Sequence, residues 1–284
     1  MNYSFKEEGD FKYVEIGEGQ PIIILHGLMG GLSNFTGVTE FFSQNGYKVV
    51  LPELPLFSLP LLSTNVKSFA EYLKDFIEFL GFNQVILLGN SLGGHIGLLY
   101  TKLYPSKVKA LVITGSSGLY ESAMGSGYTK RSDYEVMKAK AQEVFYDPEV
   151  ATKDLVDRVF DIANKRESVV RLLAFAKSAI RHNMAEDLPT LNIPTCLIWG
   201  KYDKVTPPHV AEEFHALLPK SDLFWVDNCG HAPMWDSPLD VIDEIKKSEK
   251  KVFYKIQGNE RWIDNKRLNK LGIHLLRCIL SERI

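Results

Sequence analysis

Ser91, Asp203 and His231 are the residue types that nucleophilic catalysis by serine requires, and each lies in a short loop after an apolar run. A serine hydroxyl alone is a poor nucleophile, because it needs a base to take its proton and a third group to hold that base in the right tautomer. Histidine can act as the base and a carboxylate as the orienting group. If the fold brings the three loops together, the chain can carry out acyl transfer.

The segment from residue 85 to residue 104 indicates how Ser91 would be presented. Its apolar start has β character and passes through a glycine-rich turn straight into a helical pattern. A serine on so sharp a turn needs neighbours without side chains two residues before and after it, and Gly89 and Gly93 meet that need. The Leu92 amide would then lie at a helix N-terminus, where partial positive charge favours an oxyanion.

Asp203 and His231 follow two later predicted strands, at residues 194–199 and 223–226. Loops that follow parallel strands open at the same edge of a sheet, so the three side chains can converge there. Ser91, Asp203 and His231 would in that case form one site.

Each of these residues also has a purely structural interpretation. Ser91 would be a turn residue, Asp203 would cap a helix that starts near Pro207, and His231 would be a core or loop histidine. Asp227 is a weaker candidate for the acid. The remaining histidines outside the glycine-rich loop have no competing set of partners, and we expect structural roles for His95, His209, His215 and His274.

Apolar periodicity predicts strands and helices in alternation. The expected strands are 3–7, 11–16, 22–25, 47–51, 85–88, 108–113, 194–199 and 223–226. The expected helices are 35–45, 66–80, the one after Ser91, 209–218 and one beginning at Pro238. This alternation predicts an α/β fold with a mostly parallel central sheet, right-handed crossovers and helices on both faces.

Residues 115–193 break the alternation. They contain helical patterns at 134–144, 154–165 and 167–180 and no convincing strand. An all-helical insertion after the sixth strand is typical of a cap over the carboxyl ends of the strands, where open α/β sheets bind ligands. We therefore predict a core of residues 1–114 and 194–247, a cap of 115–193, and a basic C-terminal tail of 248–284.

A glycine-rich loop at residues 26–31 follows the predicted strand 22–25. It lacks the lysine of a Walker motif and the GxGxxG spacing, so its sequence does not favour nucleotide binding. The glycines instead allow the backbone to approach the serine turn, with the Leu28 amide as a second oxyanion donor. We expect His26 to bond the loop rather than to take part in catalysis.

The proline-rich run at residues 52–62 is unusually apolar for a loop. Exposed apolar loops tend to form binding surfaces, and the alternative is a loop buried under another segment. As a binding surface, the run would help to build an apolar acyl pocket.

Composition places the chain among cytoplasmic globular proteins. Of its residues, 45% are hydrophobic, no apolar run is long enough to span a bilayer, and the start lacks a signal-sequence pattern. The three cysteines show neither metal-like spacing nor an even disulfide framework. Residues 246–284 hold eleven Lys or Arg against four Asp or Glu, and we expect a solvated tail rather than one that binds nucleic acid.

Four motifs together resemble the α/β-hydrolase superfamily, in its capped branch of serine esterases and C–C bond hydrolases. They are His26-Gly27, GNSLGG at 89–94, GKYDKVTPP at 200–208 and CGHAP at 229–233, and the resemblance spans residues 10–245. The resemblance implies a nucleophile elbow at Ser91, with His231 as general base and then acid, and Asp203 as its orienting carboxylate. It also implies an oxyanion hole formed by the amides of Leu28 and Leu92.

The predicted reaction is hydrolysis of a small carboxylic ester or thioester with an apolar acyl part, through an acyl-enzyme and without a cofactor or metal. The alternative is hydrolysis of a C–C bond in a dienoic acid of the meta-cleavage type, since Asn90 before the serine resembles that group. Asn90 would then contact the substrate, and Arg171 or Arg181 would bind its carboxylate. Ala232 departs from the group, which has tryptophan directly after the histidine. A non-catalytic binding protein is a further alternative.

Overall fold

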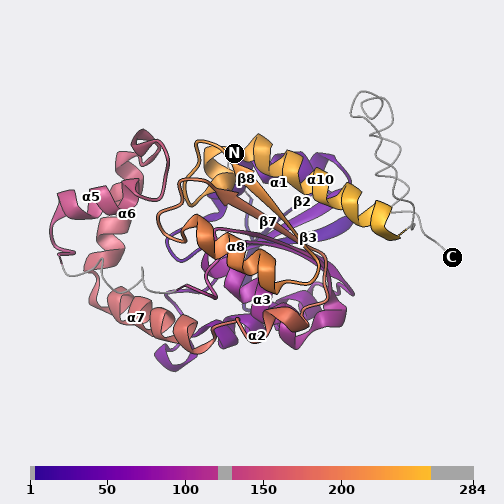
Figure 1. The fold of residues 1–284 in the computed structure, drawn as a ribbon. Helices are drawn as coiled ribbons and strands as arrows, with labels where there is room; N and C mark the ends of the chain where they lie inside the picture. The colour runs from indigo at the N-terminus through magenta and orange to yellow at the C-terminus, as the bar shows by residue number, and fades with distance from the viewer. Residues whose placement is uncertain (1–3, 121–129, 257–284) are drawn as a thin grey trace.

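The computed structural model describes residues 4–120 and 130–256, which form an eight-stranded sheet flanked by helices (Figure 1). The strands are β1 (Lys6–Glu8), β2 (Phe11–Ile16), β3 (Gln20–Leu25), β4 (Tyr47–Pro52), β5 (Val85–Asn90), β6 (Val108–Thr114), β7 (Thr195–Gly200) and β8 (Ser221–Val226). Their order across the sheet is β1-β2-β4-β3-β5-β6-β7-β8. The pairings from β4 to β8 are parallel, and β2 pairs antiparallel with β1 and β4. The predicted, mostly parallel sheet is confirmed.

Helices cover both faces of the sheet, which explains why its central strands are apolar without alternation. The core helices are α1 (Thr36–Gln44), α2 (Val66–Phe79), α3 (Leu92–Leu103), α8 (Pro208–Leu217), the short α9 (Pro233–Asp236) and α10 (Pro238–Ile256). In Figure 1, α1 and α10 lie on one side of the sheet and α2, α3 and α8 on the other. Each face has its own hydrophobic cluster, and every residue of β5 and β7 is buried.

The helical insertion follows β6, the sixth strand, as predicted. It contains α5 (Tyr134–Gln142), α6 (Lys153–Asn164) and α7 (Arg166–Arg181), and Figure 1 shows them beside the sheet. The 3₁₀ turns of the chain are η1 (Leu32–Phe35), η2 (Leu61–Ser63), η3 (Pro105–Lys107), η4 (Pro148–Val150) and η5 (Leu188–Thr190). Residues 130–193 contain no strand, and amphipathic spacing in α6 and α7 buries Val156, Val159, Leu172 and Phe175.

The proline-rich loop 52–62 packs partly against the core and is exposed at most of its other positions. Leu54 and Leu56 are buried, whereas Leu62 is 95% exposed. The Arg171 guanidinium of α7 donates to the Leu59 carbonyl and to Thr64 Oγ1, which ties the loop to the insertion. The loop is therefore partly covered by another segment, which was one of its two expected interpretations.

The closing helix α10 continues past the charged residues 248–251 to Ile256. Its first part packs Val241, Ile242 and Ile245 into the cluster beneath α1. The rest of the predicted tail, including Cys278 and His274, lies outside the described residues. Within 4–120 and 130–256, no helix is long and apolar enough to cross a membrane.

Candidate active site

Ser91 lies on a strained turn between β5 and α3. Its backbone has φ 54° and ψ −119°, a conformation that residues with a side chain rarely adopt. A Cβ at Gly89 would lie 2.5 Å from the Gly93 carbonyl carbon, and one at Gly93 would lie 2.1 Å from the Leu25 oxygen. The turn is thus possible only with glycine at both positions, which is the steric requirement expected from the sequence.

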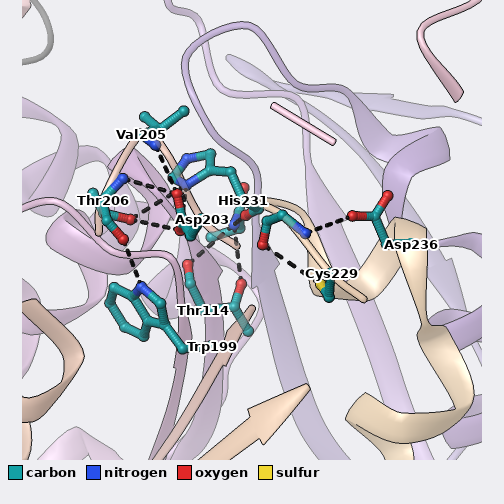
Figure 2. A network of polar contacts seen from close by, with 10 residues as sticks. Thr114, Trp199, Asp203, Val205, Thr206, Cys229, His231 and Asp236 are labelled. Carbon is teal, nitrogen blue, oxygen red and sulfur yellow. Dashed lines mark hydrogen bonds and ion pairs between the residues drawn. The ribbon is translucent and has the colours of Figure 1, made fainter. Parts of the chain in front are cut away.

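Asp203 is fully buried and uses both carboxylate oxygens. Oδ1 accepts hydrogen bonds from the amides of Val205 (2.8 Å) and Thr206 (2.9 Å). Oδ2 lies 2.9 Å from His231 Nδ1 and also accepts from Thr206 Oγ1 at 2.9 Å. One oxygen therefore holds the loop before α8 while the other holds the histidine (Figure 2). Pro207, not Asp203, is the N-cap residue of α8.

His231 is buried beside Asp203, and Figure 2 shows its ring facing that carboxylate. The 2.9 Å contact fixes Nδ1 as the nitrogen that carries the proton, because a carboxylate only accepts. Gly115, which follows β6, also lies close to the ring. Its φ is 48°, and a Cβ there would be 2.8 Å from His231 Nδ1. A side chain at this position would displace the imidazole.

Ser91 and His231 line a single cavity of about 460 Å³. The core contributes the loop residues 27–30, Lys204, Val205 and Ala232, together with Trp235 of α9. The insertion contributes a mainly apolar wall, from α5 (Met137, Ala141), α6 (Leu155, Val159) and α7 (Leu172, Leu173). The charged residues of the wall are Lys140, Glu143 and Lys204, and Lys140 lies 3.1 Å from Glu143. The cavity thus combines the candidate nucleophile and base with an apolar surface.

The loop at residues 26–31 closes against the serine turn. A Cβ at Gly27 would lie 3.2 Å from Ser91 Cβ, and Leu28 lines the cavity. Leu92 is the first residue of α3, so its amide has no acceptor within that helix. The two predicted oxyanion donors therefore lie on segments adjacent to Ser91.

His26 holds the loop and has no free ring nitrogen. Nδ1 lies 2.9 Å from the Gly27 carbonyl, and Nε2 lies 3.2 Å from the Leu54 amide, from which it accepts. Burial lowers the pKa of His26, which keeps the ring neutral in this arrangement. These contacts agree with the expected structural role.

Of the three predicted substrate contacts, only Asn90 lies at the cavity. Asn90 borders the cavity, but its amide nitrogen is hydrogen-bonded to protein groups. Arg171 and Arg181 are absent from the cavity wall: Arg171 binds the loop 52–62, and Arg181 is exposed at the end of α7. No residue of 52–62 lines the cavity either. The structure thus places neither arginine where it could bind a substrate carboxylate in the cavity, and it does not place the proline-rich loop at the acyl pocket expected of it.

The competing titratable residues have other partners. Asp227 is exposed and lies 2.6 Å from Lys201 Nζ. His95 is fully buried, with Nε2 2.8 Å from the His182 carbonyl, and burial lowers its pKa to about 4. His209 packs edge-on against Tyr120, and His215 bonds Ser221. Among residues 4–120 and 130–256, no three His, Cys, Asp or Glu side chains are grouped as metal ligands would be.

Three contributors to the site were missed from the sequence. Thr206 donates to Asp203, Lys204 borders the cavity, and the Val144 carbonyl accepts from the His231 amide at 2.7 Å. Lys204 and Thr206 could have been found from their place in the loop that carries Asp203. The Val144 contact could not, since it joins residues 87 positions apart through backbone atoms.

Comparison with known proteins supports the class that this geometry indicates. The family model for the alpha/beta hydrolase fold matches residues 20–152 and 161–238, so the chain belongs to that family. A crystal structure of an alpha/beta hydrolase enzyme from the metagenome of lagoon sediments of Mar Chica, Morocco, is 51% identical, with a TM-score of 0.74. That alignment covers 87% of this chain and 98% of the other.

Two curated relatives carry the names of different hydrolases. A 2-hydroxy-6-oxononadienedioate/2-hydroxy-6-oxononatrienedioate hydrolase from a Pseudomonas species is 26% identical, over 81% of this chain and 93% of its own length. Lipase 3 from a Moraxella species is 25% identical, over 80% and 76%. The predicted fold family and the predicted enzyme class, a serine hydrolase, are thereby confirmed.

Proposed function

We propose that the protein hydrolyses a small carboxylic ester or thioester through an acyl-enzyme formed on Ser91. The observation that carries this proposal is the convergence of Ser91 and His231 on one cavity, with His231 Nδ1 bound to the buried Asp203. Because Asp203 holds the proton on Nδ1, Nε2 is free to accept the serine proton.

The reaction then follows from the positions of these groups. His231 takes the Ser91 proton as Oγ attacks the carbonyl carbon, and the amides of Leu28 and Leu92 stabilise the oxyanion. The C–O or C–S bond breaks as His231 returns the proton to the leaving alcohol or thiol. Water, activated by the same histidine, then attacks the acyl-enzyme, releases the carboxylic acid and restores Ser91.

The cavity wall supports an apolar acyl group as the substrate part that the insertion binds. Met137, Leu155 and Leu172 come from three different helices of the insertion and line the same cavity. Burying the acyl chain against them would contribute about 25 cal/mol for each Å² of apolar surface removed from water. We also propose that residues 115–193 act as the cap of the site, and we retain a cytoplasmic location as a prediction from the sequence.

Hydrolysis of a C–C bond is the second candidate, favoured by the names of relatives such as the hydrolase from the Pseudomonas species. Trp235 lines the cavity, although Ala232 stands directly after His231. Assays with p-nitrophenyl esters of increasing chain length beside a dienoic ketone acid separate the two reactions. Faster turnover of the ketone acid would overturn the esterase proposal.

Covalent labelling tests the nucleophile directly. A fluorophosphonate probe should label the wild-type protein, with loss of fluoride, and should leave Ser91→Ala unlabelled. A matched variant, Ser33→Ala, removes a serine outside the cavity wall and should label as the wild type does. Absence of label on folded wild-type protein would contradict the assignment of Ser91.

A further inference from the structure

The backbone of His231 is held from two directions. Its amide donates to the Val144 carbonyl at 2.7 Å, and its carbonyl accepts from Asn90 Nδ2 at 3.0 Å. Val144 belongs to the insertion, just after α5, whereas Asn90 ends β5 and precedes the candidate nucleophile. The candidate base is therefore fixed between the core and the insertion by its own main chain.

The side-chain amide nitrogen of Asn90 is fully used within the protein. Besides the His231 carbonyl, Nδ2 lies 3.0 Å from both the carbonyl and the hydroxyl oxygen of Thr114. An amide group has only two hydrogens to donate, and Asn90 is 5% exposed. Only Oδ1, an acceptor, is left for a ligand, so the geometry argues against Asn90 as a donor to substrate.

On the insertion side, the contact depends on a close approach of two main chains. A Cβ at Gly230 would lie 2.4 Å from the Val144 oxygen and 2.9 Å from the Phe145 carbonyl carbon. Phe145 packs edge-on against Trp235, with ring centroids 5.1 Å apart, and Tyr146 packs against Tyr202 at 4.8 Å. The segment 144–146 thus contacts Tyr202, next to Asp203, as well as residues close to His231 in sequence.

The loop that carries His231 has a further contact, with α9. The Gly230 amide donates to Asp236 Oδ2 at 3.0 Å, a contact that Figure 2 shows beside Cys229. Together, these contacts hold residues 230 and 231 at three backbone polar groups: the Gly230 amide, the His231 amide and the His231 carbonyl. Because Asp203 already fixes the direction in which the ring faces, we expect these contacts to set how far the imidazole lies from Ser91.

We propose that Asn90 is a positioning residue for His231. Together with the contact of segment 144–146 on the histidine loop, it forms a clamp that holds the His231 main chain from the core and from the insertion. The inference rests on the proposed function, since it assumes that His231 is the base for Ser91. It predicts that disturbing either half slows the chemical step without weakening the binding of the acyl chain to the α5–α7 wall.

Asn90→Leu tests the core half, because leucine has a similar size and no donor. We expect kcat on a p-nitrophenyl ester to fall roughly tenfold to a hundredfold, the usual cost of a misplaced catalytic group, with KM within about threefold of wild type. The rate of fluorophosphonate labelling should fall by the same factor. Thr101→Val is the matched control, since it removes another buried side-chain bond to a carbonyl, at 2.7 Å within α3.

Outcomes of this experiment separate the clamp from its alternatives. A rise in KM with kcat unchanged would make Asn90 a substrate contact and overturn the proposal, and so would an unchanged kcat. Asn90→Ser, with a shorter hydroxyl donor, should recover part of the lost kcat. Because wild-type protein is labelled at Ser91 whether or not the clamp exists, failure of the proposed function is recognised separately by absence of wild-type labelling.

Gly230→Ala tests the insertion half independently of Asn90. Its methyl group must displace Val144, so kcat should fall roughly tenfold or more, and the loss should be smaller than multiplicative when combined with Asn90→Leu. Gly97→Ala controls for adding a methyl group to a buried glycine, because its Cβ would meet only the ends of leucine side chains, the nearest being that of Leu111 at 3.3 Å. Fully multiplicative losses in the double variant would show that the two contacts do not act on one histidine.

Discussion

The carboxyl edge of the sheet and the helical insertion contribute to the same cavity in different ways. At the edge, the candidate groups are fixed by backbone geometry: Ser91 by two glycines that admit no side chain, and Asp203 by three hydrogen bonds besides that to His231. The insertion contributes apolar side chains from three helices. On the proposed function, the edge would determine which bond-breaking chemistry is possible, and the insertion would determine which substrate fits.

Asp203→Asn is the substitution expected to impair the catalytic groups at the sheet edge most strongly. The amide group would leave His231 in the wrong tautomer, so kcat should fall by about a thousandfold to ten-thousandfold while the fold is kept. Asp227→Asn is the matched control, since Asp227 is exposed and, among the described residues, paired with Lys201 alone, and it should change kcat less than about twofold. Steady-state kinetics with one p-nitrophenyl ester measures both variants. The reverse ranking would identify Asp227 as the acid.

The same division explains how much could be predicted from the sequence. The edge was predictable because its constraints are local: glycines two residues on either side of Ser91, and loops that directly follow apolar runs. Asn90 was expected to contact substrate, yet its amide binds Thr114 and His231, which are distant in sequence. Arg171 was expected at the substrate and instead binds Leu59. Local spacing fixes where a residue stands along an element, but tertiary packing decides what its side chain meets.

The junction between the two regions should be sensitive to acid through His95. This residue, in α3, bonds the His182 carbonyl just after α7, and burial lowers its pKa to about 4. The unfolded chain takes up the His95 proton near pH 6.5 and the folded protein only near pH 4, so stability is lost as the pH falls between these values. The loss would be about 2 kcal/mol at pH 5 relative to pH 7.

Urea unfolding of wild type and His95→Gln at pH 7 and pH 5 measures this contribution. Glutamine does not titrate, so the variant should lose less stability between the two pH values than the wild type. The difference between the two proteins isolates His95 from other groups such as His26 and His182, whose pKa values burial also lowers. An identical pH dependence in both proteins would show that His95 is protonated alike in the folded and unfolded states.

Lys204 tests whether the edge also contributes to substrate selection. It belongs to the edge, and it places a positive charge on the cavity wall. In the described part of the chain it has no ion-pair partner, whereas Lys140 is paired with Glu143. Lys204→Gln should therefore lower kcat/KM for an ester with a terminal carboxylate by about threefold to tenfold, and leave a neutral ester of equal length nearly unchanged. Lys201→Gln, which loses a surface pair with Asp227, should affect neither substrate. If both esters respond equally to Lys204→Gln, the lysine shapes the cavity rather than selecting charge, and specificity then rests on the insertion alone.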